Sequence, residues 1–161
     1  MAVLGLALLI PHVLIQRTRV HGDSMLPTMQ EGDTLLIDKL TYRFRRPKRF
    51  EIVVFPYQYR ENTYYIKRII GLPGETIRIE DGVIYINGSA LQEHFGNARI
   101  REAGLAGKEM TLGRDEYFVL GDNRNFSLDS REPSVGNVKA KEIVGRAAFC
   151  LFPLERFGVL K

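Results

Sequence analysis

The sequence has few of the residues that build disulfides and metal sites. Its single cysteine, Cys150, lies in the apolar run 147–152 and is predicted to be a small buried hydrophobic residue. One cysteine excludes a disulfide within the chain, so cysteine usage does not indicate the compartment. The 3 histidines form no cluster with cysteines or carboxylates at metal-ligand spacing. We predict neither a metal site nor another cofactor.

The sequence also lacks an apolar run long enough for a complete membrane crossing. Residues 2–10 and 13–15 are apolar, but a proline and a histidine interrupt them, and a bilayer requires about 20 such residues. The segment has no basic N-terminal region and no Ala-x-Ala cleavage site, so it is a poor secretory signal. It is either a buried helix or the tail of a membrane anchor whose upstream half is missing. We take residues 1–16 as the truncated anchor and residues 17–161 as one β domain.

Strong charge of one sign is absent as well. The formal net charge is +4, and the basic residues are spread along the chain except for a dense run within residues 43–49. This distribution gives little support to nucleic-acid binding, which we do not predict, whereas an anionic membrane surface fits the same charge. With 45% hydrophobic and 26% charged residues, the chain is predicted to be globular, and 161 residues suit one domain.

Short β-rich runs separated by Gly, Pro, Asn and Asp predict a mainly β domain of antiparallel sheets. The clearest element is a hairpin with alternating strands at residues 76–80 and 83–87, joined by Asp81-Gly82 in a type I′ turn. Residues 88–114 show little periodicity and several glycines, which indicates a small loop-rich insertion. Further strands are predicted at residues 34–37, 50–55, 63–70, 116–120 and 143–151.

Two residues in polar islands beside predicted strand ends are candidates for catalysis. Taken alone, Ser24 is typical of an ordinary turn serine. Lys67 interrupts a run of β-branched and aromatic residues, so it either faces solvent by strand alternation or is buried with a depressed pKa. A neutral lysine amine can take the proton of a serine hydroxyl where no histidine is available. The islands are residues 22–28, 32–34, 65–75 and 121–131.

The histidines are weaker candidates for a base. His12 lies in the apolar N-terminal segment and His94 in the predicted insertion. His21 is close to Ser24 in sequence, but no carboxylate that could orient it is obvious. A Ser-His-Asp triad is therefore disfavoured.

Together the four islands resemble bacterial type I signal peptidases, the leader peptidases of peptidase family S26, and three of them match the family's ordered motifs. The serine motif is similar to residues 24–28 (SMLPT), the lysine motif to residues 65–75 (YIKRIIGLPGE) and the last motif to residues 121–131 (GDNRNFSLDSR). The resemblance extends from about residue 4 to residue 151. It implies the fold that signal peptidases share with LexA, a mainly β arrangement of antiparallel sheets.

The resemblance also implies roles for individual residues. Ser24 is expected to be the acylated nucleophile, Lys67 the base that deprotonates it and later activates water, and Ser127 the residue that orients the Lys67 amine. Gly22 stands where some members carry an oxyanion-binding serine, as in the Gly-bearing, Gram-positive-like branch. The oxyanion would then depend on the Ser24 backbone N–H, with the glycine permitting close approach of the substrate backbone. The expected structural ion pairs are Asp129 with Arg131 and Asp122 with Arg68.

The substrates implied are secretory preproteins with small residues at the first and third positions before the scissile bond. An extended peptide could pair with strand edges near residues 17–21 and 63–66, with shallow apolar pockets selecting small side chains. Met25, Ile66 and Tyr65 are candidate pocket residues, and ordinary core packing is an open alternative for them.

The implied location is the membrane surface, with a single-pass anchor and the catalytic domain on the extracytoplasmic side. Arg17 and Arg19 directly follow the apolar segment, and the positive-inside tendency by itself favours the opposite orientation. Basic residues upstream of a truncated anchor would resolve this conflict.

Two other functions compete with the peptidase interpretation. A soluble, self-cleaving regulator of the LexA or UmuD type shares the Ser/Lys fold. Against it, no helix-turn-helix region precedes the core, the N-terminus is apolar, and residues 73–75 and 121–124 resemble signal peptidases. The other alternative is a non-catalytic β module that binds peptides or membranes through a basic face.

Overall fold

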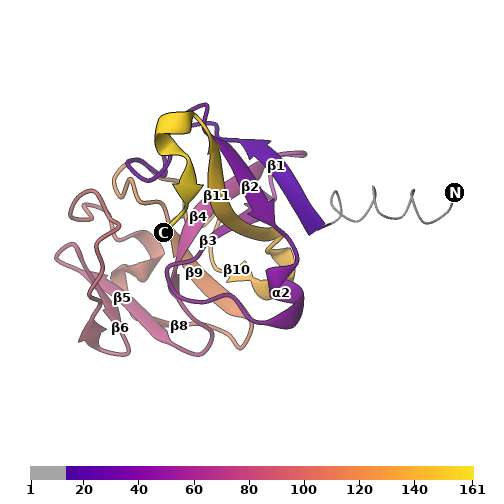
Figure 1. The fold of residues 1–161 in the computed structure, drawn as a ribbon. Coiled ribbons are helices and arrows are strands. Elements are labelled where there is room, and N and C mark those ends of the chain that lie inside the picture. Colours follow the sequence, from indigo (N-terminus) through magenta and orange to yellow (C-terminus); the bar gives the residue numbers. More distant parts are fainter. Residues whose placement is uncertain (1–13) are drawn as a thin grey trace, which may run out of the picture.

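The computed structural model describes residues 14–161, in which nearly all regular structure is β (Figure 1). The larger sheet has the strand order β1-β2-β11-β3-β4-β9-β10, with β12 paired to β11, and the smaller sheet has the order β7-β6-β5-β8. The strand pairs are antiparallel, which confirms the predicted fold class. Among residues 14–161 no helix has the length and apolar character needed to cross a membrane.

The larger sheet brings together strands that are far apart in the sequence. Its centre is strongly apolar, because four successive residues of β3 are buried. A short helix, α2 (Thr41–Phe44), follows β2, and the 3₁₀ turns η2 (Ala140–Glu142) and η3 (Leu154–Arg156) flank β11. The strands are β1 (Ile15–Arg19), β2 (Thr34–Asp38), β3 (Ile52–Pro56), β4 (Tyr64–Gly71), β9 (Glu116–Leu120), β10 (Val138–Lys139), β11 (Gly145–Phe152) and β12 (Gly158–Val159).

The smaller sheet is built around the predicted hairpin. Asp81 and Gly82 have φ angles of 48° and 72°, and a type I′ turn requires positive φ at both positions. Two short strands within residues 88–114 pair with the outer edges of the hairpin, so the predicted insertion completes this sheet. The elements are β5 (Thr76–Glu80), β6 (Val83–Ile86), β7 (Ser89–Ala90), η1 (Gly104–Gly107) and β8 (Met110–Thr111).

The core consists of three clusters of buried side chains, of which the first joins the two sheets. One joins Ile70, Phe118 and Leu120 of the larger sheet to the isoleucines of the hairpin. Another lies beside β2 and β11 and includes Met25 and the single cysteine, Cys150, which is buried as predicted. The third fills the space around β3, β4 and β9. The turn after β1 is thus packed into the core through Met25.

The beginning of the described chain forms an edge strand. Ile15 pairs with Asp38 and Gln16 with Ile37, so the predicted boundary at residue 16 falls inside β1. Residues 1–13 of the predicted anchor lie outside the described residues. The strand predicted at residues 50–55 begins later, because Phe50 has a left-handed φ of 69°.

Candidate active site

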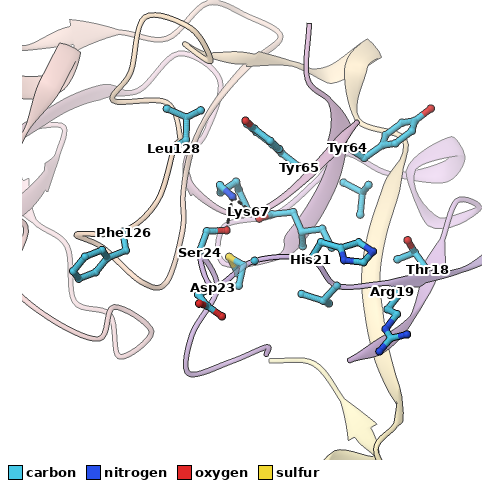
Figure 2. A pocket seen from close by; sticks show the side chains of 15 residues that line it. Thr18, Arg19, His21, Asp23, Ser24, Tyr64, Tyr65, Lys67, Phe126 and Leu128 are labelled. Atoms are coloured by element: carbon cyan, nitrogen blue, oxygen red, sulfur yellow. Dashed lines mark hydrogen bonds between the residues drawn. The ribbon is translucent and has the colours of Figure 1, made fainter. Parts of the chain in front are cut away.

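Ser24 and Lys67 meet in a cavity between β1 and β4 (Figure 2). Ser24 lies in the turn that follows β1, and Lys67 lies within β4. Although the two residues are 43 positions apart in sequence, Lys67 Nζ is 2.7 Å from Ser24 Oγ. The structure therefore brings the predicted nucleophile and base within hydrogen-bond distance.

The Lys67 amine is withdrawn from water. The residue is 3% exposed, its Nζ also donates to the Ile66 carbonyl oxygen at 3.1 Å, and the Tyr65 ring centroid is 5.0 Å away. Burial disfavours the charged form and lowers the pKa of Lys67 to about 8, while the charges of Asp129 and Asp122 oppose this effect. An appreciable fraction of the amine is thus neutral near physiological pH.

Ser127 lies close to Ser24 but makes no hydrogen bond to the Lys67 amine. Its Oγ is buried and has no hydrogen-bond partner among residues 14–161. The Lys67 Nζ instead bonds to Ser24 and Ile66, so the expected Ser127–Lys67 hydrogen bond is not formed in this structure. Both serines pack on Gly121, where a Cβ would clash with Ser127 Oγ and the Ser24 carbonyl oxygen. Because glycine has no side chain, the loops that carry Ser24 and Ser127 can approach each other at Gly121.

The cavity around the pair has a volume of about 290 Å³ and is lined by all three predicted pocket residues, Met25, Ile66 and Tyr65. Met25 is only 2% exposed and also packs in the core beside β2. Met25 therefore lines the pocket and packs in the core at the same time, so the two roles that the sequence left open for it are compatible.

Open strand edges border the cavity. Within residues 14–161, β1 ends the larger sheet and pairs only with β2, while β4 pairs with β9 only from Arg68 onward. Residues 64–67 therefore keep one backbone edge without a strand partner among the described residues. Phe126 and Leu128, which are 74% and 40% exposed, lie on the other side of Ser24 from Tyr64 (Figure 2). An extended peptide is a suitable ligand for such edges.

Comparison with known proteins matches the family described as "Signal peptidase, peptidase S26" to residues 1–152. The chain is 38% identical to Signal peptidase I T of Bacillus subtilis (strain 168), covering 97% of this chain and 83% of the relative. It is 36% identical to Probable signal peptidase I-1 of Synechocystis, covering 99% of this chain and 83% of the relative. The chain belongs to the signal peptidase family S26.

A solved structure agrees with this assignment. The crystal structure of a signal peptidase I from Enterococcus faecalis V583 is 33% identical and superposes with a TM-score of 0.51, covering 63% of this chain and 97% of that one. The protein is thus a signal peptidase of type I, a serine endopeptidase whose substrates carry signal peptides, rather than a self-cleaving regulator. The relatives from Bacillus agree with the Gram-positive-like branch predicted from the sequence.

Both ion pairs expected in this signal peptidase are formed. The Arg68 and Asp122 side chains are fully buried, with Nε–Oδ1 and Nη2–Oδ2 distances of 2.8 and 2.7 Å. Arg131 makes the same two-pronged contact with Asp129, at 2.8 and 2.9 Å. Asp129 also accepts the backbone N–H of Gly121 at 3.1 Å. This second pair therefore fixes the glycine on which the two serines pack.

Asn123 holds the serine turn, although no sequence signal separates it from its neighbours in residues 121–131. Its backbone N–H donates to the Ser24 carbonyl oxygen and its Nδ2 to the Asp23 carbonyl oxygen, both at 3.0 Å. Its Oδ1 accepts from Asn97 Nδ2 at 2.8 Å. An asparagine side chain is suited to this position because it both donates and accepts.

Replacing Asn123 with alanine is expected to lower kcat for preprotein cleavage about 10- to 100-fold with little change in KM, because the serine turn loses its side-chain contact. Steady-state kinetics on a signal-peptide substrate measure the effect. Asn125→Ala is the matched control, since the Asn125 side chain bonds to Arg99 and Arg101 instead. Equal losses of kcat in the two variants would show that Asn123 does not position the serine.

His21 has a carboxylate partner that the sequence did not reveal. Its Nδ1 is 3.1 Å from Glu31 Oε1, and Glu31 Oε2 accepts the Gly22 N–H. The His21 and Glu31 side chains are 79% and 57% exposed, and the Ser24 hydroxyl bonds to Lys67 rather than to the imidazole. Gly22 has a left-handed φ of 87°, which favours glycine. Within residues 14–161 no group of three His, Cys, Asp or Glu side chains is arranged to hold a metal ion.

Proposed function

We propose that this peptidase cleaves signal peptides with Ser24 as its nucleophile and Lys67 as its general base. The observation that carries the proposal is the Nζ–Oγ distance of 2.7 Å at an amine that is only 3% exposed. A general base must lie within hydrogen-bond reach of the proton that it removes and must be deprotonated near the working pH. Lys67 meets both requirements, because its pKa is lowered to about 8.

The reaction proceeds in two proton-balanced stages. Neutral Lys67 takes the hydroxyl proton of Ser24 while Oγ attacks the carbonyl carbon of the scissile bond. The protonated amine then gives that proton to the leaving amine as the C–N bond breaks, which leaves an acyl-enzyme and a neutral lysine. In the second stage Lys67 takes a proton from water, the hydroxide attacks the ester carbonyl, and the proton returns to Ser24 Oγ. The sequence of steps requires no cofactor.

The developing oxyanion is assigned to the Ser24 backbone N–H. This donor makes no hydrogen bond within the described part of the chain, whereas the Gly22 N–H already donates to Glu31. Gly22 instead gives the substrate backbone room, since nothing lies within 4 Å of the place where its Cβ would be. Ser127 does not bond to Lys67 in this structure, so its proposed role in orienting the amine requires its hydroxyl to turn towards Nζ. The buried hydroxyl would thereby gain the partner that it lacks.

The proposed substrates are secretory preproteins with small residues at the first and third positions before the cleaved bond. An extended peptide would pair with β1 at residues 17–19 and with the open edge at residues 64–67. Alternate side chains of such a peptide point to the same face, so the first and third positions would both face Met25, Ile66 and Tyr65.

The proposed location is the membrane surface. The residues that precede β1 would form the last part of a single-pass anchor, with the catalytic domain on the extracytoplasmic side. The domain begins directly after the apolar segment, because β1 starts at Ile15. Ser24 follows Ile15 by nine positions, which span at most about 30 Å, and this keeps the nucleophile near the proposed bilayer.

The pH profile of cleavage tests the proposed base. With the pKa of Lys67 at about 8, kcat/KM is expected to rise about tenfold per pH unit below pH 8 and to level off above it, because only the neutral amine acts. The measurement is kcat/KM between about pH 5.5 and 10 on a synthetic preprotein with alanine at both small positions. A Lys108→Met variant, altered at an exposed lysine, should give the same curve. An optimum confined to acidic pH would contradict Lys67 as the base.

A further inference from the structure

The dense basic run noted in the sequence divides into paired and unpaired cations. Arg45 forms an ion pair with Glu51, and Arg49 forms one with Glu75 at 2.5 Å. Three others in the run are exposed and form neither ion pairs nor side-chain hydrogen bonds with any residue of 14–161: Arg43, Arg46 and Lys48. Two of the five cations therefore stabilise the fold, and three are free to bind an anionic partner.

A large apolar side chain stands among these unpaired cations. Phe44, the last residue of α2, is 82% exposed. Beside it, an apolar groove of about 610 Å³ lies between α2 and the start of β1, with Leu36, Leu40 and Ala148 among its lining residues. An exposed apolar surface with cations at its border is typical of an interaction site. We call Arg43, Phe44, Arg46 and Lys48 the basic corner.

The basic corner lies where the chain enters the domain. The Lys39 N–H donates to the Leu14 carbonyl oxygen at 2.9 Å, and Leu14 and Ile15 line the apolar groove together with Phe44. Figure 1 shows α2 near the N-terminal end of β1. With the proposed anchor ending where β1 begins, the connectivity of the chain holds the corner at the bilayer surface.

We propose that the basic corner binds the headgroups of anionic phospholipids and seats the catalytic domain on the membrane. Arg43, Arg46 and Lys48 meet lipid phosphates, while Phe44 enters the boundary between headgroups and acyl chains. The partner is a lipid surface because the site combines unpaired cations with apolar area at the point where the proposed anchor ends. This inference rests on the proposed membrane attachment.

A single tryptophan can report on the corner, because the chain contains none. The full chain carrying Phe44→Trp is reconstituted into phosphatidylcholine vesicles with or without phosphatidylglycerol, with brominated acyl chains as quencher. The F44W fluorescence is expected to shift to the blue and to be quenched strongly only with phosphatidylglycerol. The matched reporter Leu105→Trp, on η1 and 42% exposed, should remain unquenched in both.

Charge removal separates binding at the corner from general electrostatics. In the F44W background, Arg43→Gln/Arg46→Gln/Lys48→Gln is compared with Arg99→Gln/Lys108→Gln/Arg114→Gln, which alters three exposed cations elsewhere. Both triples lower the formal net charge from +4 to +1, since 4 − 3 = 1. The first is expected to weaken the phosphatidylglycerol-dependent association about 100-fold, at about 5-fold per charge, and the second to change it little.

Equal quenching with and without phosphatidylglycerol, no quenching in either vesicle, or equal losses in the two triples would each overturn the proposal. Cleavage of a short soluble signal-peptide substrate serves as the separate readout for the peptidase. A chain that cleaves this peptide while F44W stays unquenched would disprove the basic corner and leave Ser24 and Lys67 as proposed. Anion-dependent quenching in a chain that cleaves nothing would support the corner and disprove the proposed peptidase site.

Discussion

Replacing Lys67 with methionine is expected to abolish preprotein cleavage while making the domain more stable below pH 8. Loss of the base should lower kcat by about 10⁴-fold or more, because a nucleophile and its base act as one unit. The gain in stability follows from the lowered pKa, about 8 when folded against 10.5 when unfolded. Between these values the unfolded chain binds more protons, so the wild-type protein becomes more stable as pH rises through this window.

Below pH 8 the charged Lys67 amine is buried in the folded wild-type protein, which costs at most about 3 kcal/mol of stability. Methionine fills a similar volume and carries no charge, so the variant avoids this cost. Denaturant unfolding at about pH 6 should therefore show Lys67→Met to be more stable by about 1 to 3 kcal/mol. An inactive variant that is more stable than the wild type cannot owe its inactivity to unfolding. A Lys67→Met protein with near-normal turnover would remove lysine from the mechanism.

Ser24→Ala is the companion variant for the same experiment. It should also abolish cleavage, whereas Ser89→Ala, the same chemical change at an exposed position of β7, should leave kcat and KM unchanged. Mass spectrometry of the wild-type protein during turnover should detect the acyl-enzyme on Ser24. Near-normal turnover by Ser24→Ala would exclude Ser24 as the nucleophile, since oxyanion binding alone can leave only a small residual rate.

Breaking the Arg68–Asp122 pair is expected to have the largest effect on stability. Both side chains are 0% exposed, and Arg68 also donates to the carbonyl oxygens of Phe50 and Lys161. Asp122→Ala leaves the guanidinium buried without its counter-charge, which should lower the free energy of unfolding by about 3 to 5 kcal/mol. Urea unfolding followed by circular dichroism measures the loss.

The control for Asp122 is the exposed pair formed by Arg78 and Glu80. Their side chains are 45% and 50% exposed, so Glu80→Ala should change the free energy of unfolding by less than about 1 kcal/mol. Asp122→Asn adds a kinetic readout, because the Asp122 charge raises the pKa of Lys67. Removing that charge should move the rise in kcat/KM to lower pH. Equal stability losses for Asp122→Ala and Glu80→Ala would show that burial adds nothing to the pair.

The local elements were the most predictable part of the fold. The hairpin around Asp81 and Gly82 follows from a two-residue turn that needs positive φ at both positions, a preference set within a few residues. The strand at residues 116–120 was predicted with the bounds that the structure has. β1 was harder to foresee, because its first residue, Ile15, is the end of an apolar run, and the strand is defined only by its pairing with β2.

In the candidate site, only the residues that belong to the three ordered motifs could be predicted from the sequence. The three motifs singled out Ser24, Lys67 and both ion pairs, since they are contiguous runs whose order along the chain is itself informative. Asn123 and Glu31 were not singled out. Their contacts, to the Ser24 turn and to His21 with Gly22, arise from loops that approach one another only in the folded chain.

The sequence by itself determined the mainly β fold class, the hairpin, and the family to which the chain belongs. The tertiary structure alone decided that Lys67 is buried rather than facing solvent, and hence that its pKa lies at about 8. It also decided which cations of residues 43–49 are paired with another residue of the described chain and which are not. Propensities and turn preferences act within a few residues and can be read from the chain, whereas desolvation and ion pairing depend on neighbours that only folding supplies.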